Sequence, residues 1–152
     1  MLRYGVYDCP LGKLVIGWEA ETVVSLKLMD CAGQRHCPSP VSDLAAQQIT
    51  AYLTGVRREF DFPVSLAGTP FQMKVWDALL RIPYGETRTY GEIAAAIGNP
   101  KAARAVGQAA NCNPIWIVIP CHRVVGTGKK LTGYAGGLSR KQFLLDLEQH
   151  NL

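Results

Sequence analysis

The first third of the chain is rich in Val, Leu, Ile and aromatic residues, which form short runs between turn-forming segments at 10–12 and 19–21. Runs of this length and composition are typical of β-strands, and short turns favour antiparallel neighbours. The sequence therefore predicts a three-stranded meander, with strands over 3–7, 13–18 and 22–29.

A helical hydrophobic period follows a polar, proline-containing loop at 30–40. Apolar residues recur at helical spacing between 42 and 53, with Ser42 or Asp43 as the N-cap and Gly55 as the stop. We expect this helix to cover one face of the sheet.

The hydrophobic period changes from about two residues to about 3.6 beyond a linker of small and turn-forming residues at 67–70. Four helices are predicted after it, over 71–80, 89–97, 101–110 and 139–147. The expected fold class is α+β, with a three-stranded antiparallel sheet and a covering helix in residues 1–66. Residues 71–152 would form a C-terminal helical domain.

Two of these helices are separated by a tight Gly-Asn-Pro turn at 98–100, which is a helix-turn-helix pattern. The second helix carries small residues over much of its surface, and three polar side chains project from it. The small residues are Ala102, Ala105, Gly107 and Ala109, and the polar ones are Lys101, Arg104 and Gln108. A bare surface lets a DNA backbone approach, but it also suits tight packing against another helix. The pattern alone leaves both interpretations open.

Composition narrows the function classes. At 18% charged residues the chain is too apolar for a disordered polyelectrolyte. No apolar run approaches the roughly 20 residues of a membrane span, and no signal-peptide pattern is visible, so we expect a cytoplasmic protein with no membrane partner. Residues 1–70 hold six Lys and Arg against seven Asp and Glu, whereas residues 71–152 hold ten against five, so the net charge of +4 comes from the second half. This asymmetry weakly indicates a polyanionic partner.

Cys121 is the strongest candidate nucleophile among five cysteines, which we expect to be thiols in this compartment. It follows a short apolar run and stands between Pro120 and the pair His122 and Arg123, whose positive charge favours the reactive thiolate. The alternative is a small buried hydrophobic residue. Because adjacent side chains point in different directions, His122 would reach the thiol through a water molecule.

Five segments of the second half carry a resemblance to a known family. They are YGETRTY at 84–90, GNPKAARAVG at 98–107, NP at 113–114, IPCHRV at 119–124 and GYAGGL at 133–138. In this order and spacing they resemble the motifs of the O6-alkylguanine-DNA alkyltransferase family, over about residues 71 to 148. The first domain resembles that family only loosely, through the turn after Cys9.

The resemblance implies direct, irreversible transfer of the O6-alkyl group of guanine, and less readily the O4-alkyl group of thymine, from DNA to a protein cysteine. Each molecule would act once, as a monomer, on double-stranded DNA bound through the minor groove without sequence preference. Displacement at an alkyl carbon needs a soft nucleophile and neither metal nor cofactor. The alternatives are a sensor of alkylated DNA with the same helix-turn-helix, which the retained cysteine disfavours, and a Cys-His hydrolase, for which no oxyanion hole is evident.

The resemblance also assigns catalytic roles. Cys121 is the acceptor, and His122, through a water molecule, and Glu148 form the relay that removes the thiol proton. Asn113 braces the segment that carries the nucleophile. Tyr90 rotates the phosphate of the target nucleotide with its ring and gives a proton to guanine N3 from its hydroxyl.

The alkylguanine pocket implied by the family includes backbone groups of the motif segments. The carbonyls of Cys121 and Val124 accept from the exocyclic amine, and the N–H of Ala135 reaches O6, with Tyr134 beside them. Trp116 stands where the family pattern favours small residues or Pro. We expect Trp116 to narrow the pocket against bulky alkyl groups.

The DNA contacts implied by the family centre on Arg104, which enters the duplex and fills the place of the extruded base. The target base must leave the stack before the sulfur can reach it. Further contacts are expected at Gln72, Gly91, Asn99, Ala102, Ala103, Ala105, Gly107 and Thr127.

A zinc site is the last candidate. Cys31, His36 and Cys37, with Cys9 nearby in the predicted sheet, have irregular spacing without the paired ligands of zinc motifs. They also miss the ligand positions of those family members that bind zinc. We therefore expect reduced thiols and no metal.

Overall fold

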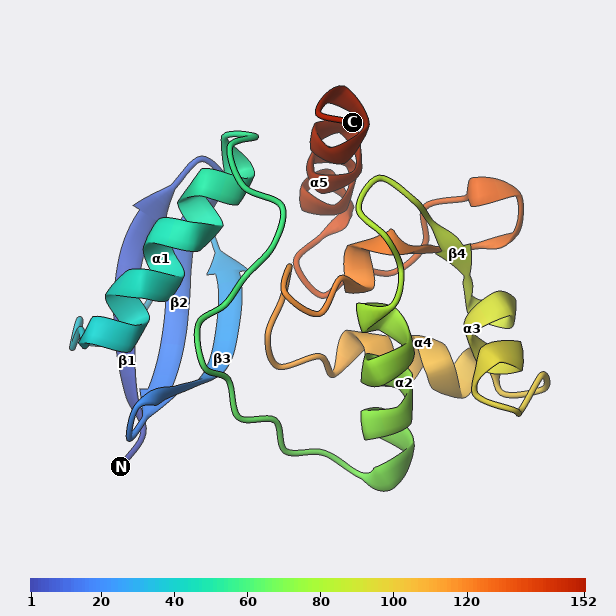
Figure 1. Ribbon diagram of the computed structural model, residues 1–152, viewed down its shortest axis with the longest axis horizontal. Coiled ribbons are helices and arrows are strands. Elements are labelled where there is room, and N and C mark those ends of the chain that lie inside the picture. Colours follow the sequence, from blue (N-terminus) through green and yellow to red (C-terminus); the bar gives the residue numbers. More distant parts are fainter. The chain divides into compact units, whose positions relative to one another are not determined.

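The computed structural model describes residues 1–152 and has the predicted α+β architecture (Figure 1). The chain divides into two compact units. One is Met1–Leu66 with Pro114–Trp116, and the other is Ala67–Asn113 with Ile117–Leu152. No helix is both long and apolar enough to cross a membrane.

The short segment Pro114–Trp116, which the predicted division places in the C-terminal domain, belongs to the first compact unit. Leu26 donates its backbone N–H to the carbonyl of Pro114 at 2.8 Å, and Trp116 donates to the carbonyl of Leu26 at 3.0 Å. The segment thereby satisfies backbone groups at the edge of the sheet, which would otherwise lack partners.

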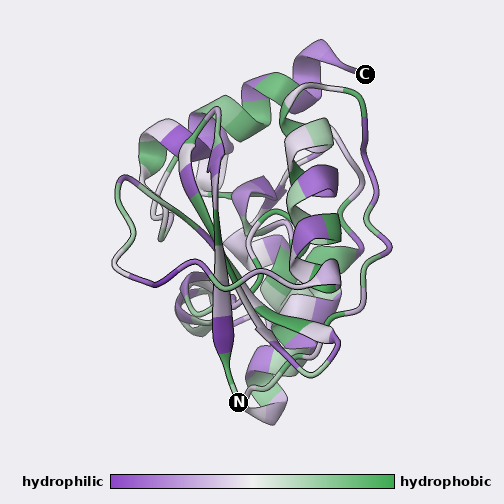
Figure 2. Cartoon of the chain, turned by 90° about the vertical axis from the view of Figure 1, so that its left-hand side faces the viewer, coloured by the Kyte–Doolittle hydropathy of each residue, from purple (hydrophilic) through white to green (hydrophobic).

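The first unit is built on strands β1 (Arg3–Cys9), β2 (Gly12–Glu19) and β3 (Thr22–Met29), in the order β1-β2-β3 with antiparallel pairing. The predicted meander is confirmed. Leu14 pairs with Leu28 and Ile16 with Leu26, and all four side chains are buried. Their common face forms the core under the helix. In Figure 2, the strands and the helices each carry both hydrophobic and hydrophilic residues.

Helix α1 (Pro40–Leu53) begins two residues before the predicted start. Ser39 is the N-cap and accepts from the backbone N–H of Ser42, and Pro40 occupies the first helical position, so the predicted cap at Ser42 or Asp43 is wrong. Ile49 and Tyr52 are fully buried toward the sheet.

The second unit is mainly helical. Its elements are α2 (Pro70–Leu80), β4 (Arg88–Thr89), α3 (Tyr90–Ala96), α4 (Ala103–Asn111), η1 (Cys121–Arg123), β5 (Val124–Val125), η2 (Thr127–Lys129) and α5 (Leu138–His150). Strands β4 and β5 form a short parallel pair that sequence patterns did not predict, because two residues are too few for a hydrophobic period.

Helices α3 and α4 form the predicted helix-turn-helix. Thr89 caps α3 and pairs with Glu92 in a capping box. Gly98 adopts φ +83° in the turn, a conformation that favours glycine. Helix α4 begins at Ala103, two residues after the predicted start, because the turn extends past Pro100.

Helix α5 is longer than predicted at both ends. Lys141, Leu144 and Glu148 share its buried face, at relative positions i, i+3 and i+7. This periodicity places a lysine and a glutamate inside the second unit.

Candidate active site

Cys121 opens the 3₁₀ turn η1, directly after Pro120, and is 7% exposed. The side-chain nitrogen of Asn113 donates to the Sγ atom of Cys121 at 3.2 Å and to the carbonyl of Ile119 at 2.8 Å. Asn113 therefore ties the end of α4 to the turn that carries the thiol.

Burial raises the pKa of Cys121 to about 11, although the hydrogen bond from Asn113 and the charge of Lys141 oppose the rise. The resting group is therefore a thiol. The expectation that neighbouring positive charge yields a thiolate is corrected, because desolvation outweighs that charge.

His122 and Glu148 form a fully buried pair. The Nε2 atom of His122 lies 2.7 Å from Oε2 of Glu148, and the side chains are 0% and 1% exposed. Burial lowers the pKa of His122, despite the opposing effect of Glu148. A neutral imidazole held by a carboxylate can accept a proton, and the resulting imidazolium would be stabilised by the same carboxylate.

Arg123 is a further member of this cluster, which the sequence analysis named only for its positive charge beside Cys121. Its Nε atom lies 2.8 Å from Oε1 of Glu148, its Nη2 atom 2.9 Å from Oε2, and its Nη1 atom donates to the carbonyl of Ile82 at 2.7 Å. Burial alone would raise the pKa of Glu148, but the hydrogen bonds from His122 and Arg123 together lower it below its usual range. Glu148 therefore stays ionised.

The backbone N–H of Gly85 also donates to Oε1 of Glu148, at 3.0 Å. The sequence offered one signal for the contact between Arg123 and Glu148, which is the position of Arg123 directly after His122. The residues near Arg123 in the sequence do not show that its partner lies on α5.

Tyr90, the first residue of α3, lies beside the glycine-rich loop at 126–137. Its hydroxyl donates to the carbonyl of Thr132 at 3.0 Å.

Lys141 donates to the same carbonyl at 3.0 Å and to that of Gly133 at 3.2 Å. The Nζ atom of Lys141 lies 5.9 Å from the centroid of the Tyr90 ring. Lys141 is a residue that the sequence analysis did not identify. The sequence signal that could have indicated Lys141 is its spacing of seven residues from Glu148, which places both residues on one face of the predicted helix.

Comparison with known proteins decides the family. The sequence model of one protein family, the DNA-binding domain of 6-O-methylguanine DNA methyltransferase, matches residues 70–150. The family model of the ribonuclease-like domain of 6-O-methylguanine DNA methyltransferase matches residues 2–66. The chain belongs to the O6-methylguanine-DNA methyltransferase family.

Relatives of this methyltransferase family align over nearly the whole chain. The methylated-DNA–protein-cysteine methyltransferase of Mycobacterium tuberculosis is 47% identical over 154 residues, covering 98% of this chain and 93% of the relative. The constitutive enzyme of Bacillus subtilis is 46% identical over 159 residues, covering 98% and 96%. The chain is accordingly an enzyme, a methylated-DNA–protein-cysteine methyltransferase.

Solved structures of family members resemble the structure of this chain. The crystal structure of the M. tuberculosis O6-methylguanine methyltransferase superimposes with a TM-score of 0.89 at 45% identity and covers 100% of this chain and 95% of that one. The structure of M. tuberculosis OGT in complex with DNA gives a TM-score of 0.90 at 47% identity and covers 98% and 94%.

The predicted DNA contacts of the methyltransferase fall on helices α2, α3 and α4 and on the segments next to them. Arg104 is exposed on α4, whereas Ala103, Ala105 and Gly107 are half-buried on that helix. A Cβ atom on Gly107 would lie 3.6 Å from Cε1 of Tyr90, so this part of α4 runs close to the tyrosine ring.

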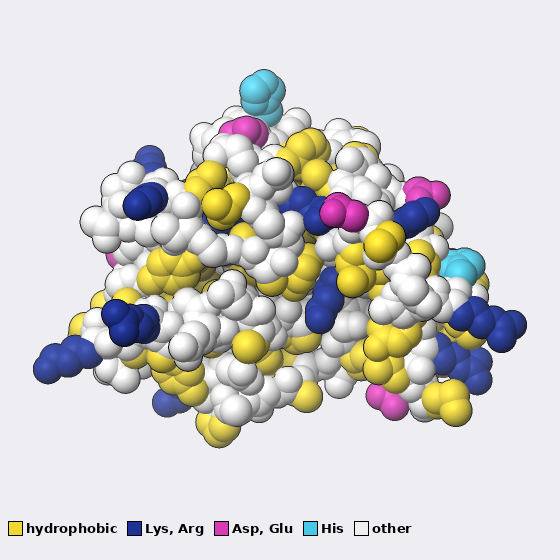
Figure 3. Space-filling view, turned by 180° about the vertical axis from the view of Figure 1, so that it is seen from behind, with side chains coloured by type: hydrophobic (Ala, Val, Ile, Leu, Met, Phe, Trp, Pro, Cys, Tyr) yellow, Lys and Arg dark blue, Asp and Glu magenta, His cyan; other side chains and the backbone are white.

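The remaining predicted contacts are distributed around these helices. Gln72 takes part in the capping box of α2, Ala102 precedes α4, and exposed positions are occupied by Gly91, Asn99 and Thr127. On the face of the molecule in Figure 3, Lys and Arg side chains are scattered and do not form one patch.

The predicted pocket residues of the methyltransferase lie in different surroundings. Val124 is buried in β5, Tyr134 is half-buried, and Ala135 is exposed. Burial raises the pKa of Tyr134 well above its usual value, and a negative charge on Cys121 would raise it further. Trp116 is buried and belongs to the first unit, so its predicted place beside the alkyl group stays a prediction.

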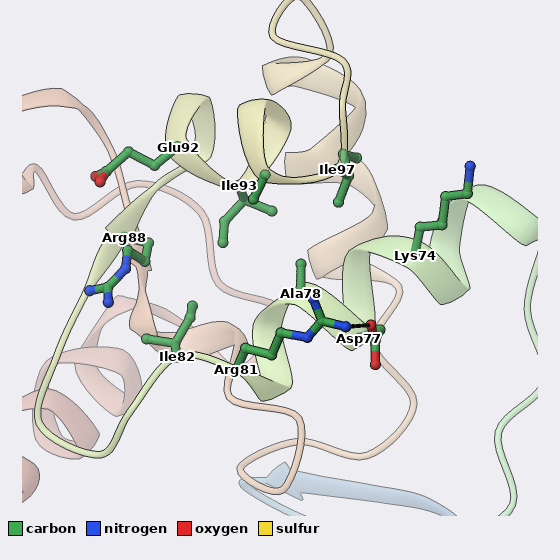
Figure 4. A pocket seen from close by; sticks show the side chains of 10 residues that line it. Lys74, Asp77, Ala78, Arg81, Ile82, Arg88, Glu92, Ile93 and Ile97 are labelled. Carbon is green, nitrogen blue, oxygen red and sulfur yellow. Dashed lines mark hydrogen bonds and ion pairs between the residues drawn. The ribbon is translucent and has the colours of Figure 1, made fainter.

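A pocket of about 390 Å³ lies between α2 and α3 (Figure 4). It carries charges of both signs, including the ion pair of Arg81 with Asp77, above an apolar floor that includes Ile82 and Ile93. None of the predicted site residues lines it, and they therefore lie outside this pocket.

None of the other four cysteines forms a disulfide. Cys31 and Cys112 are exposed, and Cys9 and Cys37 are half-buried. His36 accepts the backbone N–H of Val6 on its Nδ1 atom at 2.9 Å. No group of three or more His, Cys, Asp and Glu side chains is arranged to hold a metal ion.

Proposed function

We propose that the protein repairs double-stranded DNA by moving the O6-alkyl group of a guanine, and less readily the O4-alkyl group of a thymine, onto Cys121 in a single irreversible reaction. The observation that carries the proposal is the arrangement of Cys121 beside the buried pair His122 and Glu148, in the unit that also contains the helix-turn-helix.

DNA recognition would start at α4. Its small residues permit close approach to the minor groove, and the exposed Arg104 is free to enter the duplex as the damaged base leaves. Because these contacts involve backbone and groove shape, binding would show little sequence preference. A monomer is sufficient, since every proposed catalytic group comes from one chain.

Activation of the thiol is the first chemical requirement. Because burial raises the pKa of Cys121 to about 11, the group is almost entirely a thiol at pH 7. A neutral His122 can take the proton through a water molecule, and ionised Glu148 then stabilises the imidazolium. Asn113 would hold the sulfur during this step, through the hydrogen bond it already donates.

Transfer then forms the bond between sulfur and the alkyl carbon and breaks the bond between that carbon and O6. The electron pair of the broken bond moves into the guanine ring. Tyr90 would supply a proton to N3, after its hydroxyl leaves the carbonyl of Thr132, and the net reaction passes the thiol proton to guanine. The backbone carbonyls of Cys121 and Val124 and the N–H of Ala135 would orient the base.

The product is a thioether, which none of the surrounding residues can hydrolyse, so each molecule would react once. The test is a titration of a duplex that contains one O6-methylguanine. We expect repair to stop when one guanine has been restored per active protein molecule. Continued turnover would overturn the single-use mechanism, and tight binding to unrepaired DNA would support a sensor instead.

A further inference from the structure

The turn at 126–130, which follows β5, presents two lysines that form no ion pair within the chain. Lys129 and Lys130 are exposed, and none of the ion pairs in the structure includes either of them. An antiparallel bridge joins Gly126 to Lys130 and closes the turn, with the N–H of Gly126 donating to the carbonyl of Lys130 at 2.7 Å. Two adjacent positive charges are therefore held at the tip of a short, closed loop.

The acidic side chains that share a surface groove with Lys129 have other partners. These side chains are Glu86 and Asp146. Glu86 pairs with Arg88 at 3.0 Å, and Asp146 accepts from the side-chain nitrogen of Gln142 at 2.7 Å. Because neither carboxylate forms an ion pair with Lys129, the charge of this lysine is available to a partner outside the chain.

The backbone conformation at Lys129 is unusual for a lysine. Gly128 and Lys129 adopt φ +72° and φ +62°, in the left-handed region that favours glycine and is unfavourable for a residue with a Cβ atom. Glycine would fit position 129 without this cost, so the geometry of the turn does not explain the lysine. Backbone strain of this kind is concentrated at functional sites, which points to a role for the side chain itself.

The turn is fixed next to the proposed chemistry. Strand β5, which leads into the turn, directly follows the 3₁₀ turn of Cys121. Strand β5 also pairs with β4, whose last residue directly precedes α3. These connections hold the turn close to both the nucleophile and the first helix of the helix-turn-helix. Thr127, inside the turn, is one of the proposed DNA contacts.

We propose that Lys129 and Lys130 bind backbone phosphates of duplex DNA beside the extruded nucleotide, as a contact separate from α4. The inference rests on the proposed function, in which the duplex lies along α4 and the damaged base reaches Cys121. Each ammonium group neutralises a phosphate and releases counterions from the duplex, so this contact depends on salt and not on base sequence. The two lysines add affinity for DNA and take no part in the transfer of the alkyl group.

The experiment measures binding of the full-length protein to a short duplex without alkylated bases, by fluorescence anisotropy over a series of NaCl concentrations. For Lys129→Met and for Lys130→Met we expect the slope of log Kd against log salt to decrease by about 0.9, as for loss of one phosphate contact. The matched control is Lys27→Met, which removes an exposed lysine of β3 in the first unit. It should keep the slope of the wild type.

Lys129→Gly separates DNA binding from folding stability. Because glycine fits the positive φ at this position, the urea midpoint of unfolding should rise. The salt dependence of DNA binding should nevertheless decrease as much as in Lys129→Met. A Lys129→Gly variant that binds DNA with the affinity and the salt slope of the wild type would overturn the proposal for this residue.

Two further results would overturn the proposal as a whole. One is an unchanged salt slope in both Lys129→Met and Lys130→Met. The other is slower reaction of these variants with free O6-benzylguanine, which carries no phosphate, since the turn would then act on the guanine pocket. A wild type that binds the duplex but transfers no alkyl group from it to Cys121 would instead contradict the proposed function, so the two failures are distinguishable.

Discussion

Arg123 and Glu148 make a two-point buried ion pair, with Nε to Oε1 at 2.8 Å and Nη2 to Oε2 at 2.9 Å. The two residues lie 25 positions apart in sequence. The pair joins the turn that carries Cys121 to α5, and it fixes the carboxylate that contacts His122. The proposed catalytic cluster and the packing of the second unit therefore depend on the same contact.

Replacement of Arg123 by Met should lower the free energy of unfolding by about 3–5 kcal/mol, because Glu148 would be left as a buried charge with fewer donors. Urea unfolding measures this loss. The control is Arg81→Met, which removes an exposed ion pair with Asp77 and should change stability by less than about 1 kcal/mol. Equal losses in the two variants would contradict the assigned burial of the Arg123 contact.

Acidification should destabilise the protein through His122. Its pKa is lowered in the folded state, so stability that is present above the unfolded pKa of about 6.5 is lost as the pH falls. Between pH 7 and pH 5 this residue should account for up to about 2 kcal/mol of the free energy of unfolding. Glu148, whose pKa is also lowered, adds to the loss at more acidic pH.

Urea unfolding at pH 7 and pH 5 measures this dependence in two variants. His122→Gln should reduce the difference between the two pH values, whereas His150→Gln, at an exposed position of α5, should leave it unchanged. A difference in His122→Gln as large as in the wild type would show that another group titrates.

Arg104→Ala should slow repair of O6-methylguanine in duplex DNA by more than about tenfold, because no side chain then fills the place of the extruded base. Reaction with free O6-benzylguanine should be unchanged, since that substrate has no stack to leave. The rate with each substrate is obtained by measuring the fraction of alkylated protein as a function of time. Equal slowing on the two substrates would refute the proposed entry of Arg104 into the duplex.

Trp116→Ala should increase the rate of benzyl transfer relative to methyl transfer, if the indole restricts the alkyl pocket. Both guanine substrates are offered to the wild type and the variant, and the ratio of labelling rates is compared. Trp18→Ala, at a half-buried position of β2, is the control. Trp76 is not used, because its ring is buried and its Nε1 atom donates to the carbonyl of Ala109 at 2.9 Å. An unchanged ratio in Trp116→Ala would exclude a role in adduct selection.

The sequence predicted those parts of the fold that depend on neighbouring residues. The three strands follow from short hydrophobic runs and their turns, and helices α3 and α4 follow from the helical hydrophobic period on either side of the turn at 98–100. The start of α1 was misplaced because Ser39 and Pro40 form an equally good local signal two residues earlier.

Contacts between segments that are distant in sequence could not be predicted from local patterns. The pairing of Ile115 with Leu26, the ion pair of Arg123 with Glu148 and the burial of Lys141 each join segments that are distant in sequence or buried by tertiary packing. Cys121 was found because motif order marked it, whereas its raised pKa follows from burial, which the motif does not encode.

The most direct test of the account is peptide mass analysis after reaction with a duplex that contains O6-methylguanine. The account predicts one added methyl group on the peptide that contains Cys121, its absence in Cys121→Ser, and normal transfer in Cys112→Ser, where the altered cysteine is exposed and close in sequence. A methyl group on any other residue, or restored guanine with an unmodified Cys121, would contradict it.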